Sequence, residues 1–172
     1  MLEKIQYPVQ PYEVKGYCFG QRVRSRILLW ARHLGDDVIL SPGTAIMAVG
    51  EGEVVWSQMR PGRLEKRNWG GIVVVRHIHR QTQQPFYSLY GHMKDLQVKV
   101  GDMVTAGQTV GSVAEGYSPE NGWWKIPHLH FAIYVGPWME SVLSGYKRFF
   151  EHRTRFSWWR NPRHFIEEYN QG

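Results

Sequence analysis

Short apolar runs interrupted by glycine and proline fill most of the chain. The run at 128–135 is rich in aromatic and β-branched residues and is bounded by Pro127 and by a Gly-Pro pair at 136–137, a pattern typical of a strand. Two further valine-rich runs, at 54–55 and 110–113, each follow a glycine turn. The pattern predicts a mainly β protein folded over itself as an antiparallel β sandwich.

Helical patterning becomes visible only near the C-terminus. Asn161 is a suitable N-cap residue and Pro162 a suitable first-turn residue. The segment that follows, to about Tyr169, places Phe165, Ile166 and Tyr169 on one face. We therefore expect one short C-terminal helix.

The length of 172 residues is ordinary for one domain, and a hydrophobic content of 42% suits a packed core. We expect a single domain, with an irregular N-terminal arm at 1–32, a β core at 33–137 and an aromatic and basic extension at 138–172. The aromatic residues of the extension are expected to cover an edge of the core rather than to bind a ligand. They are Trp138, Phe149, Phe150, Phe156, Trp158 and Trp159.

The net charge of +6 and the pI near 9.5 favour anionic partners such as nucleic acid, a membrane surface or a polyanionic cell wall. A solvated basic surface that aids solubility explains the charge equally well. The cations form two groups, one at Arg22, Arg24, Arg26 and Arg32 and the other at Lys147, Arg148, Arg153, Arg155, Arg160 and Arg163.

Targeting signals are not visible in the sequence. The first 20 residues lack the apolar stretch of a secretory signal, and no segment approaches the length of a membrane span. The single cysteine, Cys18, excludes an internal disulfide.

Two clusters about ninety residues apart carry the residue types of a metal site. In a strand, alternate side chains share a face, so His128 and His130 are expected to project together. His33 and Asp37 lie four residues apart around Gly35, which permits a turn that aims both side chains inward. Imidazoles and a carboxylate suit zinc, and with a single cysteine available the site is expected to be open to water, as catalytic zinc sites are. The His-x-His pair alone is more often a polar strand face or an accident, and the His33/Asp37 pair alone is weaker evidence still.

Further histidines have different interpretations. His92 precedes a series of glycine turns and completes an ordered set with the two clusters. His77 and His79 are flanked by Arg76 and Arg80. Cationic neighbours disfavour a bound cation, so this second pair is expected on a solvated rim rather than at a second metal. His152 and His164 are assigned no chemistry.

The combination His33-x-Gly35-x-Asp37, Tyr90-x-His92 and His128-Leu129-His130-Phe131 resembles the signature of the lysostaphin/LytM-type zinc endopeptidases, which cut peptide bonds in bacterial peptidoglycan. The glycine-punctuated segments 41–55, 69–77 and 100–111 resemble the strands and hairpin of that family. The match covers roughly residues 30–136. It implies an antiparallel sandwich like a duplicated hybrid motif.

The resemblance implies a role for each motif residue. His33, Asp37 and His130 would bind one zinc ion, and His92 and His128 would be the catalytic residues beside the water that attacks the scissile carbonyl. Either histidine can take the proton from that water while the other stabilises the oxyanion, since imidazole titrates near neutral pH.

One loop departs from the family pattern, and a second loop is long and charged. Residues 116–127, with Trp123 and Trp124, replace the compact turn usually found before the His-x-His motif. This loop either shapes a groove beside the metal or packs as a plug on the C-terminal extension. Residues 60–68 read as a long charged loop that walls the cleft.

Other functions remain alternatives. The segment 98–108 also resembles the turn-rich half of biotinyl/lipoyl carrier domains, with Lys94 in place of the modified lysine, but that interpretation leaves the site histidines unexplained. A second alternative is a non-catalytic family member that binds the wall or activates a partner. The favoured interpretation is an active hydrolase, expected to be monomeric. It would act on peptidoglycan peptides, with anionic wall polymers as further partners and no nucleic acid, in the periplasm or outside the cell after loss of an export signal or by another route.

Overall fold

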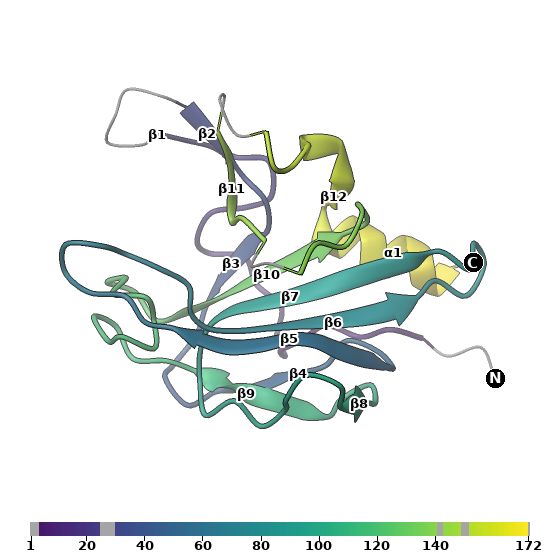
Figure 1. The fold of residues 1–172 in the computed structure, drawn as a ribbon, viewed down its shortest axis with the longest axis horizontal. Helices are drawn as coiled ribbons and strands as arrows, with labels where there is room; N and C mark the ends of the chain where they lie inside the picture. The colour runs from purple at the N-terminus through teal and green to yellow at the C-terminus, as the bar shows by residue number, and fades with distance from the viewer. Residues whose placement is uncertain (1–3, 25–29, 141–142, 149–151, 172) are drawn as a thin grey trace.

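The computed structural model describes residues 4–24, 30–140, 143–148 and 152–171. Within these residues the strands form a nine-stranded and a three-stranded sheet, both antiparallel, and one α-helix lies near the C-terminus (Figure 1). The expected mainly β, antiparallel fold is confirmed.

Four long strands form the centre of the large sheet: β5 (Gly52–Arg60), β6 (Gly70–Ile78), β7 (Pro85–Lys94) and β10 (His128–Tyr134). They are hydrogen-bonded in the order β10-β7-β6-β5. The apolar run at 72–75 on β6 is continuous rather than alternating because both faces of this strand are covered.

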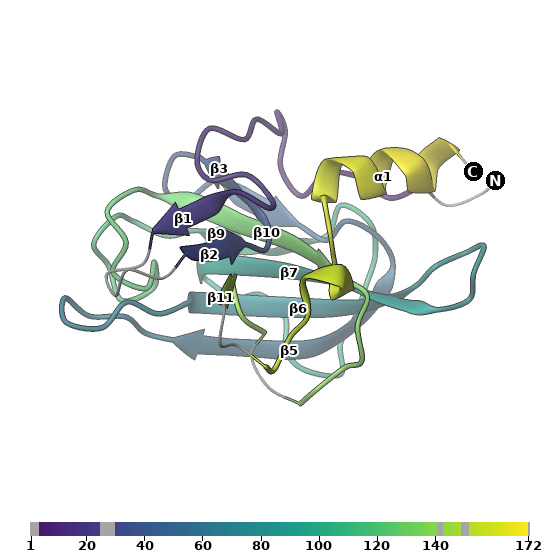
Figure 2. The same ribbon diagram turned by 90° about the horizontal axis from the view of Figure 1, so that it is seen from above.

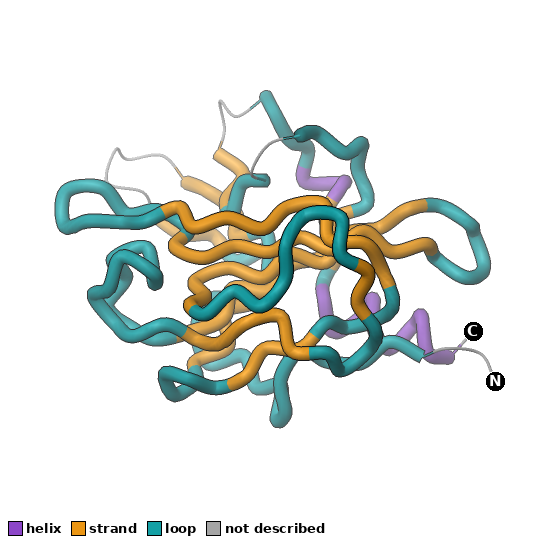
Figure 3. The backbone as a smooth tube through the Cα atoms, turned by 60° about the horizontal axis from the view of Figure 1, so that its bottom comes forward, coloured by secondary structure: helices purple, strands orange, loops and turns teal. Residues whose placement is uncertain are grey.

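The large sheet folds over to form a second layer. Strands β4 (Ala45–Met47) and β9 (Thr109–Val113) pair with each other, β9 also pairs with the end of β7, and β8 (Met103–Val104) pairs with β5. These short strands lie beneath the central ones in Figure 1, and Figure 3 shows the two sets of strands from a tilted view. The larger core cluster fills the space between them with side chains from β4 to β10, among them Ile46, Val73, Tyr90, Val110 and Leu129.

A smaller sheet covers part of the other face. It consists of β1 (Arg22–Arg24), β2 (Trp30–His33) and β11 (Tyr146–Arg148), with β2 in the middle. The N-terminal arm at 1–32, expected to be irregular, is irregular over residues 4–21 and then contributes β1 and the first three residues of β2. Strand β11 lies more than a hundred residues further along the chain, and such remote pairing leaves no local pattern in the sequence.

The C-terminal extension closes this second core, as expected. Trp159, in β12 (Trp159–Arg160), is buried with side chains of β6, β7 and β10, and the 3₁₀ turn η1 (Phe156–Trp158) packs against the same cluster together with Trp138. The predicted covering role is confirmed for these aromatic residues, whereas Phe149 and Phe150 lie outside the described residues.

Helix α1 (Pro162–Gln171) confirms the predicted helix and extends two residues beyond the expected end. The Asn161 side chain accepts a hydrogen bond from the His164 N–H at 3.2 Å, which is the N-cap interaction. Ile166 and Tyr169 are buried in the larger core cluster and Phe165 packs against it. The helix lies beside the N-terminal segment (Figure 2). It is too short and too polar to cross a membrane, and so is every helix in the described part of the chain.

Candidate metal centre and catalytic cleft

The turn between β2 and β3 (Asp36–Ile39) carries the first two candidate ligands. His33 is the last residue of β2 and Asp37 the second residue of β3. Gly35 lies between them, and a Cβ atom at this position would overlap the carbonyl oxygen of Phe131 and lie 2.8 Å from Nε2 of His130. The glycine is therefore required by close packing against β10. It does not have the left-handed backbone conformation that a turn glycine often supplies.

Strand β10 carries the other two histidines and brings one of them opposite Asp37. His128 and His130 are buried and lie on one strand, two residues apart, as expected. In the antiparallel pairing of β10 with β3, His130 is directly opposite Asp37. On its other side His130 is opposite Gly91 of β7. The register thus places one imidazole between the carboxylate of one strand and the glycine beside His92 of the other.

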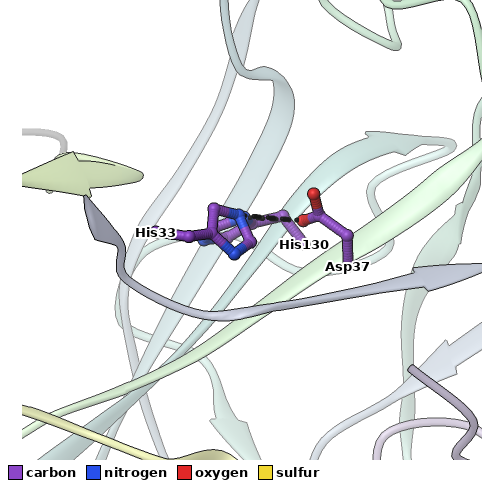
Figure 4. A group of neighbouring side chains, drawn as sticks. All are labelled: His33, Asp37 and His130. Atoms are coloured by element: carbon purple, nitrogen blue, oxygen red, sulfur yellow. Dashed lines mark hydrogen bonds and ion pairs between the residues drawn. The ribbon is translucent and has the colours of Figure 1, made fainter. Parts of the chain in front are cut away.

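Three ligand atoms converge between these strands (Figure 4). Oδ1 of Asp37 lies 3.0 Å from Nδ1 of His130 and 3.2 Å from Nε2 of His33. The two ring nitrogens are 3.1 Å apart. All three side chains are buried, and together they form a group of metal-ligating type among the described residues. His128 and His92 are not members of this group.

The donor set fits a zinc ion. A tetrahedral zinc about 2.0–2.1 Å from each ligand holds neighbouring ligand atoms about 3.3 Å apart, close to the spacings found here. Nδ1 of His33 lies 3.3 Å from the carbonyl oxygen of Cys18, to which it can donate, so the lone pair of Nε2 is free to face the ion. These are three protein ligands of the types typical of a catalytic zinc site.

The ionisation states also suit a cation. Burial opposes ionisation of the Asp37 carboxyl, but its hydrogen-bonding contacts with the rings of His130 and His33 outweigh burial, so the pKa of Asp37 lies below its ordinary value. Burial lowers the pKa of His130, against the hydrogen bond to Asp37. A carboxylate and a neutral imidazole are the forms that bind a metal.

A β-bulge directs His92 toward the same place. In the pairing of β6 with β7, Ile72 is opposite Gly91 and Gly71 is opposite Met93, so His92 is the extra residue. Its φ of 64° is in the left-handed region that non-glycine residues rarely adopt. Such local strain is common at functional sites, where the surrounding fold enforces it.

His92 and His128 form a second imidazole pair beside the ligand group. Their ring centroids are 4.4 Å apart, and the His92 ring is 6.3 Å from that of His130. Nδ1 of His128 is held by the Ile126 carbonyl oxygen at 2.7 Å. Burial, followed by the nearby imidazoles His128 and His130, lowers the pKa of His92 well below its ordinary value. This shift keeps the His92 ring neutral, with a lone pair on one ring nitrogen.

The two unusual loops wall the cleft together. A hollow of about 320 Å³ is lined by Asp37, His92 and His130 from the strands and by Arg67 and Trp124 from the loops, among other residues. The indole N–H of Trp124 donates to the Asn68 carbonyl oxygen at 3.2 Å. This lining favours the groove-shaping interpretation of the loop at 116–127 and agrees with the expectation that the loop at 60–68 walls the cleft.

His77 does not lie on a solvated rim, so that expectation is wrong. It is buried, and its Nδ1 and Nε2 contact the Glu51 carbonyl oxygen at 2.6 Å and Ser88 Oγ at 2.7 Å. Burial lowers its pKa to about 4. Position 77 is opposite Phe86 in the β6–β7 pairing and lies at the far end of these strands from His92. The residue is thus a neutral, hydrogen-bonded core histidine.

Two aromatic residues of the site had no assigned role in the sequence. The Trp69 ring stacks on His92 with centroids 5.6 Å apart and meets the His130 ring edge-on at 5.0 Å. Tyr146 lies 5.2 Å from His33, centroid to centroid. Trp69 directly follows the charged loop at 60–68, and this position is the one feature of the sequence that could have indicated a place for Trp69 in the cleft. Tyr146 is placed by the remote β2–β11 pairing and has no such signal.

Comparison with known proteins identifies relatives of this chain. Lysostaphin of Staphylococcus simulans is 33% identical over 131 residues, which cover 74% of this chain and 23% of lysostaphin. The glycyl-glycine endopeptidase ALE-1 of Staphylococcus capitis is 32% identical over 120 residues, or 68% of this chain and 28% of that protein. The peptidoglycan DD-endopeptidase ShyC of Vibrio cholerae is 31% identical over 103 residues, or 60% of this chain and 20% of that protein. The chain therefore spans about a quarter of the length of these relatives.

Solved structures share the fold. The catalytic domain of lysostaphin superposes with a TM-score of 0.56 at 23% identity, over 88% of this chain and 90% of that domain. LytU superposes with a TM-score of 0.60 at 21% identity, over 89% of this chain and 83% of that chain. The model of Peptidase family M23 matches residues 31–141, which is more than half of the chain and contains all five motif residues of the site. The chain belongs to peptidase family M23.

Proposed function

We propose that this chain is a zinc-dependent endopeptidase that hydrolyses a peptide bond in peptidoglycan cross-bridges or stem peptides. The observation that carries the proposal is the convergence of His33, Asp37 and His130 on one point, with a second imidazole pair on the same cleft. The relatives named as peptidoglycan endopeptidases support the substrate class. The described residues would act as one domain, since both core clusters share the large sheet.

The three ligand residues would hold the ion in a fixed orientation. Asp37 and His130 are opposite one another in paired strands, and His33 is held by the Cys18 carbonyl oxygen, so little rearrangement is needed. When bound, zinc supplies a Lewis acid that polarises the scissile carbonyl and makes water more acidic. His33, Asp37 and His130 themselves transfer no proton in this scheme.

His92 and His128 would handle the protons. The neutral ring of His92 can accept a proton from the attacking water, and His128, oriented by the Ile126 carbonyl oxygen, can stabilise the developing charge or return the proton to the leaving amine. With ring centroids 4.4 Å apart, both imidazoles would be within reach of one reacting group, so the two roles can also be exchanged. Water is the nucleophile, and no covalent enzyme intermediate forms.

The alternatives have less support. Lys94, the counterpart of the modified lysine in a carrier domain, is paired with Glu115 at the end of β7. A non-catalytic wall-binding member would not need the bulge that turns His92 toward His128. Activity on wall peptides would place the protein in the periplasm or outside the cell.

Digestion of purified peptidoglycan tests the proposal. The zinc-loaded protein should release fragments that carry a new free amino group and no new reducing sugar end, because a peptide bond is cut. A chelator should stop the release, and added zinc should restore it. Release of reducing ends, or the same release with the chelator present, would contradict the proposal.

A further inference from the structure

The part of the cleft beside the metal ligands is lined by unpaired arginines. Arg67 from the loop before β6 and Arg148 from β11 line the same 320 Å³ hollow as Asp37, His92 and His130. Asp37 is the one carboxylate among the residues that line it. Neither guanidinium has an ion-pair partner among the described residues. Two cations thus face a space that a substrate peptide must enter.

The same two arginines also border the next hollow along the cleft. This hollow, of about 340 Å³, shares Arg67, Trp124, Tyr146 and Arg148 with the first and adds Arg24 and Glu65. Glu65 is near a different cation, with its carboxylate 3.9 Å from Arg63. The four shared residues therefore form a basic and aromatic ridge between the two hollows, next to the ligand group.

Arg67 is held in place by its neighbours. Its guanidinium lies 4.6 Å from the centroid of the Trp124 ring, a cation–π contact that holds the charged group beside this ring. The next residue, Asn68, accepts the indole N–H of Trp124, and its own N–H donates to the Gly122 carbonyl oxygen at 3.0 Å. A Cβ atom at Gly122 would overlap the Asn68 carbonyl oxygen, so the two loops are in direct backbone contact. An arginine on such a clamped loop loses little entropy when it binds an anion.

We propose that Arg67 and Arg148 form a subsite for a carboxylate of the substrate peptide close to the scissile bond. The inference rests on the proposed endopeptidase function and specifies its substrate class: an acidic peptide, rather than a neutral one such as oligoglycine. Guanidinium groups bind carboxylates through paired, charge-assisted hydrogen bonds. Because the arginines line the hollow that holds the candidate catalytic groups, the proposal assigns the anion to the peptide being cut rather than to a separate wall polymer.

Two matched peptides test the proposal. They have the same sequence, with a carboxylate next to the scissile bond in one and a carboxamide in the other. The zinc-loaded wild type is expected to have a kcat/KM about 10- to 100-fold higher for the acidic peptide, mainly through KM, as expected for one or two charge-assisted bonds. Arg67→Gln and Arg148→Gln should each remove most of this preference, because kcat/KM for the acidic peptide should fall toward the value for the carboxamide peptide.

Controls separate charge from structure. Arg67→Lys keeps the charge but loses the planar fork, so it should retain part of the preference. Arg63→Gln, in the same loop but outside the lining of the hollow, should retain all of it. Equal hydrolysis of both peptides by the wild type, or a full preference in the Arg67→Gln and Arg148→Gln variants, would overturn the subsite and leave the endopeptidase function standing.

Binding distinguishes failure of the subsite from failure of the enzyme. If neither peptide is hydrolysed, calorimetric titration of the zinc-loaded protein with each peptide still reports on the two arginines. Tighter binding of the acidic peptide that is lost in Arg67→Gln would support the subsite even though hydrolysis fails. Equally weak binding of both peptides would overturn it.

Discussion

Gly35 lies so close to the ring of His130 that a Cβ atom on the glycine would be 2.8 Å from Nε2 of the histidine. The contact joins the turn that carries His33 and Asp37 to the strand that carries the third candidate ligand. Replacement of this glycine therefore tests whether close packing of the turn on β10 is what brings the three ligand atoms together.

Gly35→Ala should lower both the stability and the zinc affinity of the protein. The added methyl group would overlap the Phe131 carbonyl oxygen and crowd the His130 ring, which is expected to cost about 1–3 kcal/mol of unfolding free energy. Urea unfolding and zinc titration measure the two effects. Gly43→Ala is a matched control: its φ of 82° brings backbone strain, but nothing lies within 4 Å of the added atom, so zinc affinity should not change. Normal zinc affinity in Gly35→Ala would show that the packing does not position the ligands.

His92→Asn should abolish most of the turnover and keep the zinc. Asparagine tolerates the left-handed backbone conformation that His92 adopts, so this substitution preserves the bulge better than alanine would. Loss of a general acid or base is expected to reduce kcat by about 10²- to 10⁴-fold. The readouts are hydrolysis of wall peptides and zinc content. Tyr117→Asn, at another residue with positive φ but exposed, should have full activity. If His92→Asn hydrolysed wall peptides as fast as the parent, the assigned role would be wrong.

Much of the fold and the motif residues could be predicted from local pattern. The strand that carries His128 and His130 is indicated by its aromatic and β-branched residues. The C-terminal helix is indicated by Asn161 and Pro162 at its start. The structure confirms both elements. The sheet formed by β1, β2 and β11 could not be predicted, because its strands are short and β11 pairs with β2 from more than a hundred residues away. The placement of Tyr146 beside His33 depends on that pairing.

Two other features of the structure, one at the site and one remote from it, depend on backbone detail that residue spacing does not encode. The bulge at His92 is a property of the register between β6 and β7. The flanking arginines suggested a solvated position for His77, yet alternation along β6 turns His77 into the core while Arg76 is exposed. The spacing identified candidate residues, and the register of the sheet decides which of them meet.

The burial of His77 should make the protein less stable in mild acid. Its pKa is about 4 in the folded state and about 6.5 when unfolded, so the unfolded chain binds the extra proton as the pH falls below 6.5. The stabilisation is present above pH 6.5 and is lost progressively toward pH 4, and by pH 5 the loss is about 2 kcal/mol.

Urea unfolding at pH 7 and pH 5 measures this loss, with a chelator present so that metal release does not contribute. His77→Gln is the comparison, since its amide can contact both the Glu51 carbonyl oxygen and Ser88 Oγ but does not titrate. The wild type should lose about 2 kcal/mol more than this variant between the two pH values. Equal losses would rule out His77 as the source of the acid sensitivity.

Zinc content of the purified protein, measured by elemental analysis after incubation with zinc and removal of the excess, tests the central claim most directly. Asp37→Asn removes the charge of the candidate ligand. Asp36→Asn is its matched control, because Asp36 is equally buried but accepts hydrogen bonds from the Tyr12 hydroxyl and the Phe19 N–H instead. We predict about one zinc per chain in the wild type and in Asp36→Asn, and almost none in Asp37→Asn. A wild type without zinc, or an Asp37→Asn variant that keeps its zinc, would contradict the metal centre and the hydrolytic function that depends on it.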